Sequence, residues 1–342
     1  MAKSINSNYH RISKPEMSPI KMVEEIRVGN ISVLSSAITL IESSKQEDHV
    51  KANEIIDLCL PSSGNSIRIG ITGVPGVGKS TFIETFGNYL TEQGKKVAVL
   101  AIDPSSQKSG GSILGDKTRM ETLVQNPNVY VRPSPSKGSL GGVAKATRES
   151  IVLCEAAGFD VILIETVGVG QSEITVRGMV DFFLLLMLSG AGDELQGIKR
   201  GIMEMADAVV ITKADGDNLI PAKKAMSEYK NALHLFPATD AQWIPQVSHC
   251  SALSNYNIDD VWKIISSYQN TTLNNGFFKK NRKSQSHYWL NERINELLVS
   301  SFYNDNNAQL EKVKIEKDVL SGKISPFKAA EELVQKYLKN HE

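Results

Sequence analysis

One short segment constrains the fold of this chain more than any other feature: residues 73–80 read GVPGVGKS. The segment fits the pattern G-x-x-x-x-G-K-[ST], in which glycines let backbone N–H groups turn inward around phosphate oxygens. The apolar run at residues 67–72 predicts a strand before it, and residues 81–90 predict a helix after it. We therefore interpret the segment as a phosphate-binding loop at a helix N-terminus, rather than a chance glycine-rich turn.

This loop predicts specific contacts with a nucleotide. Lys79 can reach the outer phosphates, and the hydroxyl of Ser80 can bind Mg²⁺. The backbone N–H groups of the loop are expected to surround other phosphate oxygens. The residues assigned to nucleotide binding here are Gly73, Val74, Pro75, Gly76, Val77, Gly78, Lys79, Ser80 and Thr81.

The rest of the chain predicts an α/β fold, because apolar runs that suit buried strands alternate with segments that suit helices. Strands that are apolar along their whole length indicate a parallel sheet covered by helices on both faces. We predict a P-loop NTPase fold with a mainly parallel, doubly wound sheet, in which ligands bind beyond the carboxyl ends of the strands. The predicted strands are residues 67–72, 97–102, 129–131, 161–164, 182–188, 208–211 and 246–248.

Helical segments are expected on both sides of this domain. Residues 1–60 form a predicted N-terminal helical segment, in which apolar residues recur at helical spacing, and residues 61–269 form the predicted nucleotide domain. Residues 270–342 form a predicted helical C-terminal segment that begins with a polar, linker-like stretch up to Ser286. Because this last segment has apolar helical spacing but no strand, we expect it to hold a homodimer together.

Composition narrows the possible partners and the compartment. Lys plus Arg and Asp plus Glu each number 38, and this balance argues against a nucleic-acid or membrane-surface partner. The three cysteines form no C-x-x-C pair, so we expect no zinc site, no disulfide framework and a reducing compartment. The longest strongly apolar run, residues 182–188, is too short to span a bilayer, and the N-terminus lacks an apolar signal region. We therefore expect a cytoplasmic protein.

A second motif points to the base of the nucleotide. Residues 212–215 read TKAD directly after a predicted strand, and they resemble the guanine-specificity motif, usually Asn-Lys-x-Asp. Asp215 could accept hydrogen bonds from guanine N1–H and N2–H₂, which adenine does not offer, while Lys213 would lie along the base. Thr212 replaces the usual Asn, as in signal-recognition-type GTPases, which leaves open what supports the pocket. Ser251, Ala252 and Leu253 resemble the short loop whose backbone meets guanine O6.

Acidic residues at predicted strand tips are candidates for Mg²⁺ binding. Residues 165–168 resemble the Asp-x-x-Gly element of GTPases, so that Glu165 could hold the ion and the N–H of Gly168 could meet the γ-phosphate. Asp103 and Asp116 are the second and third metal candidates. Each carboxylate could instead cap a helix, and for Asp116 neither interpretation is favoured. No Gln directly follows Gly168, where Ras-like GTPases position water, although Gln171 lies nearby.

Four blocks together resemble the MeaB/ArgK family of P-loop GTPases: residues 73–81, 101–106, 165–173 and 192–199. The resemblance covers nearly the whole chain. It implies a homodimeric GTPase that binds GTP or GDP with Mg²⁺ and serves as a chaperone of adenosylcobalamin-dependent methylmalonyl-CoA mutase. Proteins of this kind gate delivery of the cofactor and protect the mutase from inactivation.

The resemblance also implies a mobile segment that carries signals between nucleotide and partner, and Asp193, Gln196 and Lys199 fall in it. We assign catalytic roles to Lys79, to Glu165, to Lys199 as the cation that completes the site, and to Gln196 as a polar relay. Local sequence alone favours the start of a solvated helix for Gln196 and Lys199, and the family resemblance favours the catalytic roles instead.

Two other functions share this fold class. A GTP-dependent metallochaperone is disfavoured because the cysteines are scattered and there is no His-rich tract. A nucleotide-dependent kinase linked to arginine and ornithine transport, an older label of the resembled family, remains open, although nothing in the sequence forms a phosphoacceptor pocket. Val74 stands where ATPases of the Min type carry a signature lysine, and this disfavours that branch.

Overall fold

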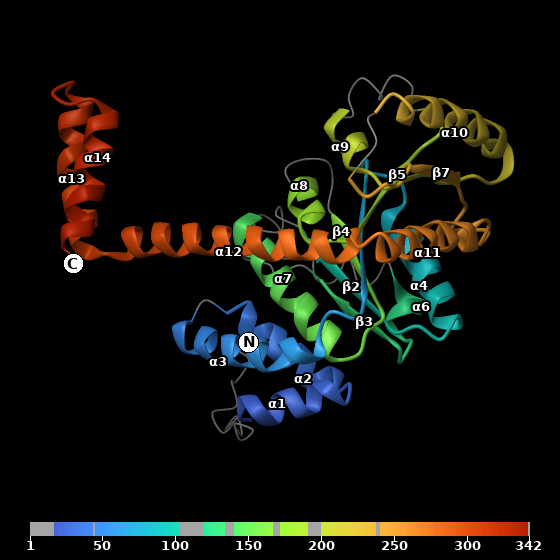
Figure 1. Ribbon diagram of the computed structural model, residues 1–342, viewed down its shortest axis with the longest axis horizontal. Helices are drawn as coiled ribbons and strands as arrows, with labels where there is room; N and C mark the ends of the chain where they lie inside the picture. The colour runs from blue at the N-terminus through green and yellow to red at the C-terminus, as the bar shows by residue number, and fades with distance from the viewer. Residues whose placement is uncertain are drawn as a thin grey trace, which may run out of the picture. The chain divides into compact units, whose positions relative to one another are not determined.

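The central sheet of the computed structural model confirms the predicted α/β fold (Figure 1). The structure describes residues 17–43, 45–102, 120–133, 140–166, 172–190, 200–236 and 240–340. Seven strands form one sheet in the order β3-β2-β4-β1-β5-β6-β7, and every pair is parallel. All seven predicted strands are present. They are β1 (Ile67–Gly73), β2 (Val97–Ile102), β3 (Val129–Arg132), β4 (Val161–Thr166), β5 (Phe182–Met187), β6 (Ala208–Ile211) and β7 (Gln246–His249).

The position of β1 in this order explains where the site forms. It lies between β4 and β5, so the loop that leaves its carboxyl end has one neighbouring strand end on each side. Neighbouring strands lie about 4.8 Å apart, which puts the end of β6 roughly 10 Å from the end of β1. Phosphate-binding and base-binding residues can therefore share one edge of the sheet.

Helices cover both faces of the sheet (Figure 1). Helix α4 follows β1 directly, and α11 packs beside it in the same apolar cluster. On the other face α8 lies so close to β1 that a Cβ on Gly70 would be 2.8 Å from Val176 Cγ1. The helical elements from α4 to α11 are α4 (Lys79–Glu92), α6 (Glu121–Val124), α7 (Leu140–Ala156), α8 (Ser172–Arg177), α9 (Arg200–Met205), η2 (Gly216–Asn218), α10 (Leu219–Leu233) and α11 (Ile258–Asn274).

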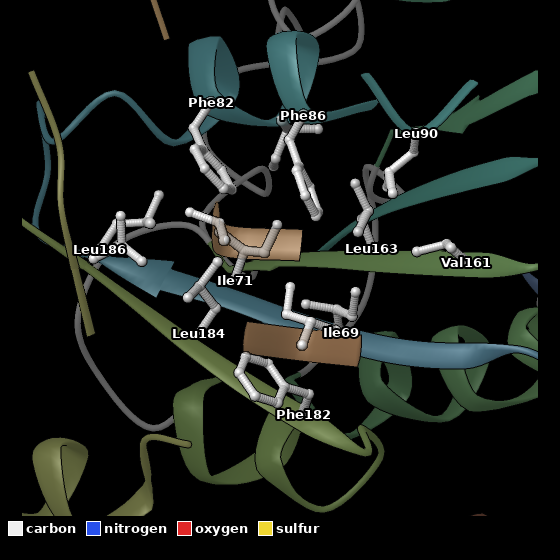
Figure 2. Packing of buried hydrophobic residues seen from close by; sticks show 14 of the residues in the cluster. Ile69, Ile71, Phe82, Phe86, Leu90, Val161, Leu163, Phe182, Leu184 and Leu186 are labelled. Atoms are coloured by element: carbon white, nitrogen blue, oxygen red, sulfur yellow. The ribbon is translucent and has the colours of Figure 1, made fainter. Parts of the chain in front are cut away.

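The main core lies between the sheet and α4 with α11. Phe82, Phe86 and Leu90 of α4 point toward the sheet in Figure 2, in which Ile69 and Ile71 of β1 belong to the same cluster. All five side chains have no exposed surface, and the Phe82 and Phe86 rings stack with centroids 5.3 Å apart. Burying one such phenylalanine contributes about 1.5–3 kcal/mol. This packing fixes the helix that begins at the phosphate-binding loop.

The predicted N-terminal helical segment is present as α1 (Pro19–Arg27), α2 (Ile31–Ile41), α3 (Gln46–Cys59) and the short η1 (Leu60–Ser62). Two of these helices have side-chain N-caps, because Ser18 accepts from Lys21 N and Asn30 accepts from Ser32 N. The guanidinium of Arg132, at the end of β3, forms an ion pair with Glu42. These helices belong to the same compact unit as the sheet, which runs from Met1 to Lys279.

The C-terminal segment is helical, as predicted, and forms a second compact unit from Lys280 to Glu342. The prediction of a linker up to Ser286 was wrong, since α11 runs on to Asn274 and the next helix begins at Phe277. The physical reason is that this stretch lacks proline and breaks only at Gly276, whose φ of 78° suits glycine. The helices are α12 (Phe277–Asn304), α13 (Asn306–Leu320) and α14 (Pro326–Lys339).

Aromatic and ionic contacts join the helices of the C-terminal unit. The ring of Tyr337 in α14 packs edge-on against Phe302 of α12, with centroids 5.2 Å apart. Lys336 of α14 lies 2.5 Å from Glu311 of α13. Across the part of the chain that the structure describes, no helix is both long enough and apolar enough to cross a membrane.

Candidate nucleotide-binding site

The phosphate-binding loop leaves the carboxyl end of β1 and enters α4. Gly73 is required at the end of the strand, because a Cβ there would lie 2.4 Å from the Leu186 carbonyl oxygen of β5. Gly78 caps α4 with a left-handed φ of 91°, a conformation that favours glycine. Between them, Pro75 and Gly76 are exposed while the Val77 side chain is fully buried. The loop thus has a buried anchor and an open rim at a helix N-terminus, where anions bind.

Lys79 lies against this loop. Its Nζ donates to the carbonyl oxygen of Gly73 at 2.8 Å and to that of Val74 at 3.4 Å. Burial lowers the pKa of Lys79, and the nearby carboxylates of Glu165 and Glu173 oppose that shift. The amine is therefore partly desolvated, which strengthens its attraction to an anionic phosphate.

Ser80 and Glu165, two of the residues predicted to bind Mg²⁺, lie in contact with each other, and Glu165 also lies near Lys79. The Ser80 hydroxyl donates to Glu165 Oε1 at 3.2 Å, and Glu165 is 7% exposed at the end of β4. A hydroxyl and a carboxylate are the hard oxygen ligands that Mg²⁺ accepts, and Mg²⁺ usually takes only one or two protein ligands with water and phosphate. The pair therefore fits a Mg²⁺ ion. Among the described residues, no group of three or more His, Cys, Asp or Glu is arranged so that it could hold a metal ion by itself.

The base-recognition motif, residues 212–215, follows β6, which is the second strand from β1 in the sheet. The Ser251 hydroxyl donates to the Asp215 carboxylate, and Ser251 has no exposed surface. Ala214 N donates to Cys250 O at 3.0 Å, which joins this turn to the loop after β7. Thr85 of α4 donates to Ala252 O at 3.0 Å, so the loop is also tied to the phosphate side. Asp215 is thus held with one carboxylate oxygen oriented by Ser251.

Lys213 connects the two halves of the site. It adopts a left-handed φ of 55°, and its Cε lies 4.0 Å from the Cβ position of Gly78. Asn218 stabilises this conformation by donating to Lys213 O at 2.6 Å, and Ser189, beyond β5, donates to Asn218. The sequence motifs missed Asn218, Ser189 and Thr85, because their contacts come from loops that meet only in the folded sheet. Leu253, the last residue of the predicted base loop, is 82% exposed.

Comparison with known proteins agrees with this geometry. The family model described as "Methylmalonyl Co-A mutase-associated GTPase MeaB" matches residues 34–307. The chain belongs to the MeaB family. The predicted family resemblance is therefore confirmed.

Relatives of this MeaB-family protein carry matching names. It is 45% identical over 310 residues to the "Probable GTPase Rv1496" of Mycobacterium tuberculosis, covering 91% of this chain and 92% of the relative. It is 44% identical over 288 residues to the "GTPase ArgK" of Escherichia coli, covering 84% and 87%. It is 45% identical over 323 residues to the mouse "Methylmalonic aciduria type A homolog, mitochondrial", covering 92% and 78%.

A solved structure titled "Crystal structure of LAO/AO transport system kinase" superposes with a TM-score of 0.75 at 34% identity, covering 95% of this chain and 99% of the other. The MeaB-family chain is a GTPase that binds GTP and GDP, as predicted.

Some predicted site residues lie outside the described residues, and their roles stay predictions. They are Asp103, Asp116, Gly168, Gln171, Asp193, Gln196 and Lys199.

Proposed function

We propose that this MeaB-family GTPase is a chaperone of adenosylcobalamin-dependent methylmalonyl-CoA mutase, which gates delivery of the cofactor and protects the mutase. The observation that carries the proposal is the family match, which runs from α2 through the whole nucleotide domain to the start of α13. The name of the mouse relative supports the same association. The output of such a protein is a conformational change in its client, driven by phosphoryl transfer to water.

Guanine recognition is assigned to Asp215. Its carboxylate has two acceptor oxygens, which suit the N1–H and N2–H₂ donors of guanine, and adenine lacks this pair of donors. Ser251 fixes the orientation of the carboxylate, and Lys213, beside Gly78, is in position to lie along the base. Ser251, Ala252 and Leu253 are assigned to the loop whose backbone meets guanine O6.

Phosphate binding is assigned to the loop and to Lys79. The N-terminal N–H groups of α4 and the Lys79 ammonium supply positive charge for the phosphates. Ser80 and Glu165 would hold Mg²⁺, which neutralises charge on the phosphates when bound. Asp103 and Asp116 are further candidates for the same ion. Glu165 therefore serves both Ser80 and the electrostatic environment of Lys79.

Hydrolysis by the isolated GTPase should be slow, and the mutase should accelerate it. No Gln follows Gly168 directly to orient the attacking water. We propose that Lys199 supplies charge and Gln196 a polar relay when the partner is bound. In other GTPases a partner accelerates hydrolysis by roughly 10³- to 10⁵-fold.

A pull-down combined with a rate measurement tests this function. The GTPase, loaded with a non-hydrolysable GTP analogue, should retain a methylmalonyl-CoA mutase subunit, and the mutase should raise the hydrolysis rate. Lys199→Ala should keep GTP affinity and the basal rate but lose the stimulation. If the mutase is neither retained nor stimulatory, the chaperone proposal fails, and transfer of phosphate to a small-molecule acceptor would identify the kinase alternative instead.

We further propose that the GTPase is a cytoplasmic homodimer joined through its C-terminal unit. Exposed apolar side chains line α14, and they include Phe327, Val334 and Leu338 at spacings of seven and four residues. Side chains at these spacings share one face of a helix. Cys59 and Cys154 are free, buried thiols whose pKa values burial raises, which suits a reducing compartment.

A further inference from the structure

His249 is a half-buried histidine that ends β7, two residues before Ser251. Both of its ring nitrogens, Nδ1 and Nε2, are shielded from solvent, and neither has a hydrogen-bond partner among the described residues. A neutral imidazole carries one N–H donor and one acceptor nitrogen. Both polar groups are left unsatisfied, which is uncommon for buried polar atoms. The ring is therefore held by packing rather than by hydrogen bonds.

The ring of His249 packs against Tyr256, at the other end of a short loop. The two ring centroids lie 5.8 Å apart, with an angle of 64° between the planes. Two backbone hydrogen bonds close the loop, because Ser251 N donates to Tyr256 O and Tyr256 N donates to Ser251 O, both at 3.0 Å. Asn257 then returns to the strand, since its Nδ2 donates to His249 O at 3.2 Å. His249 therefore supports this loop, residues 251–257, through both its ring and its backbone.

The supported loop orients the carboxylate that is assigned to guanine. Ser251 Oγ accepts from Ser254 N at 3.2 Å within the loop and donates to the Asp215 carboxylate. Asn255 and Asn257 have left-handed φ values of 53° and 56°, a conformation that costs energy for residues other than glycine and needs support from surrounding contacts. A change in the path of the loop therefore moves the hydroxyl that holds Asp215.

The surroundings of the ring favour one of its two protonation states. In the neighbouring strand β6 the apolar Ile211 lies opposite His249. Among the described residues, Lys223 of α10 and Asp260 of α11 are the charged side chains that act on the ring, and Tyr256 is the titratable group that packs on it. Burial lowers the pKa of His249, Lys223 lowers it further, and Asp260 opposes both. Protonation would add a charge and a second unsatisfied N–H, so the closed loop favours the neutral ring.

We propose that His249 is a positioning residue whose neutral ring holds the loop after β7 in the shape that binds guanine nucleotides, so that protonation of the ring weakens binding. The inference rests on the proposed assignment of Asp215 to guanine. When the loop opens, water reaches both ring nitrogens, and the pKa of the ring returns to about 6.5. The preference for the closed loop is therefore fully present above about pH 6.5, and it declines as the pH falls toward the lowered pKa of the closed loop.

Nucleotide affinities of the full chain at about pH 7.5 and about pH 5.5 test this inference. The GTP affinity of the wild type should fall by roughly 3- to 10-fold, since each pH unit below the pKa of the open loop shifts the equilibrium by at most tenfold. His249→Phe keeps an aromatic ring against Tyr256 but cannot be protonated, so it should bind GTP like the wild type at the higher pH and lose much less at the lower pH. Protonation of GTP itself affects both proteins equally. The matched control is His234→Phe, because His234 is an exposed histidine at the end of α10, and this variant should show the wild-type pH dependence.

A readout specific to the base separates opening of the loop from general unfolding in acid. ITP lacks the N2 amino group of guanine, so the ratio of GTP to ITP affinity reports how well Asp215 is placed. This ratio should fall at the lower pH in the wild type and stay constant in His249→Phe. The inference is overturned if His249→Phe loses as much GTP affinity in acid as the wild type does. A ratio near one at both pH values, together with an acid loss that His249→Phe abolishes, overturns only the assignment of Asp215.

The charged neighbours of the ring cover the case in which His249→Phe does not fold. Lys223→Gln removes the cation that opposes protonation, so the acid loss of GTP affinity should be smaller than in the wild type. Asp260→Asn removes the opposing carboxylate and should make the acid loss larger. Both effects are measured at low ionic strength, where charges at the surface act most strongly. Lys224→Gln is the matched control, because Lys224 is an exposed lysine of α10 that pairs with Glu228. Wild-type pH dependence in both Lys223→Gln and Asp260→Asn overturns the inference.

Discussion

The nucleotide domain buries its apolar side chains, whereas α14 of the C-terminal unit leaves most of its apolar side chains exposed. Every residue of β1 is buried, and Phe82 and Phe86 of α4 have no exposed surface. In α14 only Ala329 is buried, while Phe327 is 82% exposed. A single copy of the chain is therefore enough to bury the core that supports the nucleotide site. The C-terminal unit instead presents apolar surface of the kind that marks interaction sites.

The same substitution in the two regions gives the largest expected difference. Phe86→Ala should lower the free energy of unfolding by about 3–5 kcal/mol, because it empties a space between Phe82 and Trp262 in the core. Phe327→Ala should change the unfolding of the nucleotide domain by less than about 0.5 kcal/mol, as is usual for exposed positions. Denaturant titrations followed by tryptophan fluorescence measure both. Equal losses in the two variants would contradict the comparison.

Lys79→Ala tests the nucleotide site without disturbing the core. Loss of a charge contact to the transition state in a desolvated site costs on the order of 3 kcal/mol, so GTP binding or hydrolysis should nearly disappear. Phosphate release and a fluorescent GTP titration measure the two steps. Lys263→Ala is a control, because Lys263 is an exposed lysine of α11 that forms ion pairs with Asp259 and Asp260 of its own helix. A fully active Lys79→Ala protein would falsify the assignment of the loop.

The sheet could be predicted because its strands are apolar along their whole length. Residues 161–164 and 182–188 have no polar face, and this pattern requires helices on both sides. The continuation of α11 past residue 269 to Asn274 could not be predicted from polarity. The stretch from Asn270 is polar because one side of each helix faces water, and the buried Thr272 satisfies its hydroxyl on the Tyr268 carbonyl of its own helix.

The candidate site was predicted as far as local motifs reach. Lys79, Ser80 and Asp215 stand in motifs whose spacing along the chain predicts their chemistry, and Glu165 was expected near them from its place at a strand end. The contacts of Thr212, Asn218 and Thr85 were not predictable, because each joins segments far apart in sequence. Which carbonyl a buried hydroxyl meets depends on strand order and register, and a single motif encodes neither.

Asp215→Asn should change the base that the nucleotide domain prefers. Affinity for GTP should fall by about 1–3 kcal/mol, because the amide presents a donor where guanine also has donors. Affinity for xanthosine triphosphate should rise, since the amide can donate to the xanthine 2-oxo group while its oxygen still accepts from Ser251. Competition titrations with the two nucleotides measure the switch. Unchanged GTP affinity would show that Asp215 does not read the base.

Substitutions on the exposed face of α14 should change the stability of the fold least and the oligomeric state most. Replacing Phe327 and Leu338 together by Ser should convert a dimer to a monomer, as light scattering measures directly. Both side chains are exposed within one chain, so the variant loses no core packing and should keep its thermal midpoint when compared as a monomer. Lys339→Ser on the same helix is the matched control, because it removes a long exposed side chain without touching the apolar stripe.

This variant also separates assembly from nucleotide binding. The described residues assigned to GTP lie between Gly73 and Leu253, within the first compact unit, so the monomeric variant should bind GTP with wild-type affinity. Stimulation by the mutase is the informative measurement. If the monomer is still stimulated, the client reads the nucleotide domain alone, and the apolar stripe of α14 serves only assembly. If stimulation is lost while GTP affinity is kept, the client requires two nucleotide domains held by the same apolar surface. A dimer that survives the double substitution places the interface elsewhere.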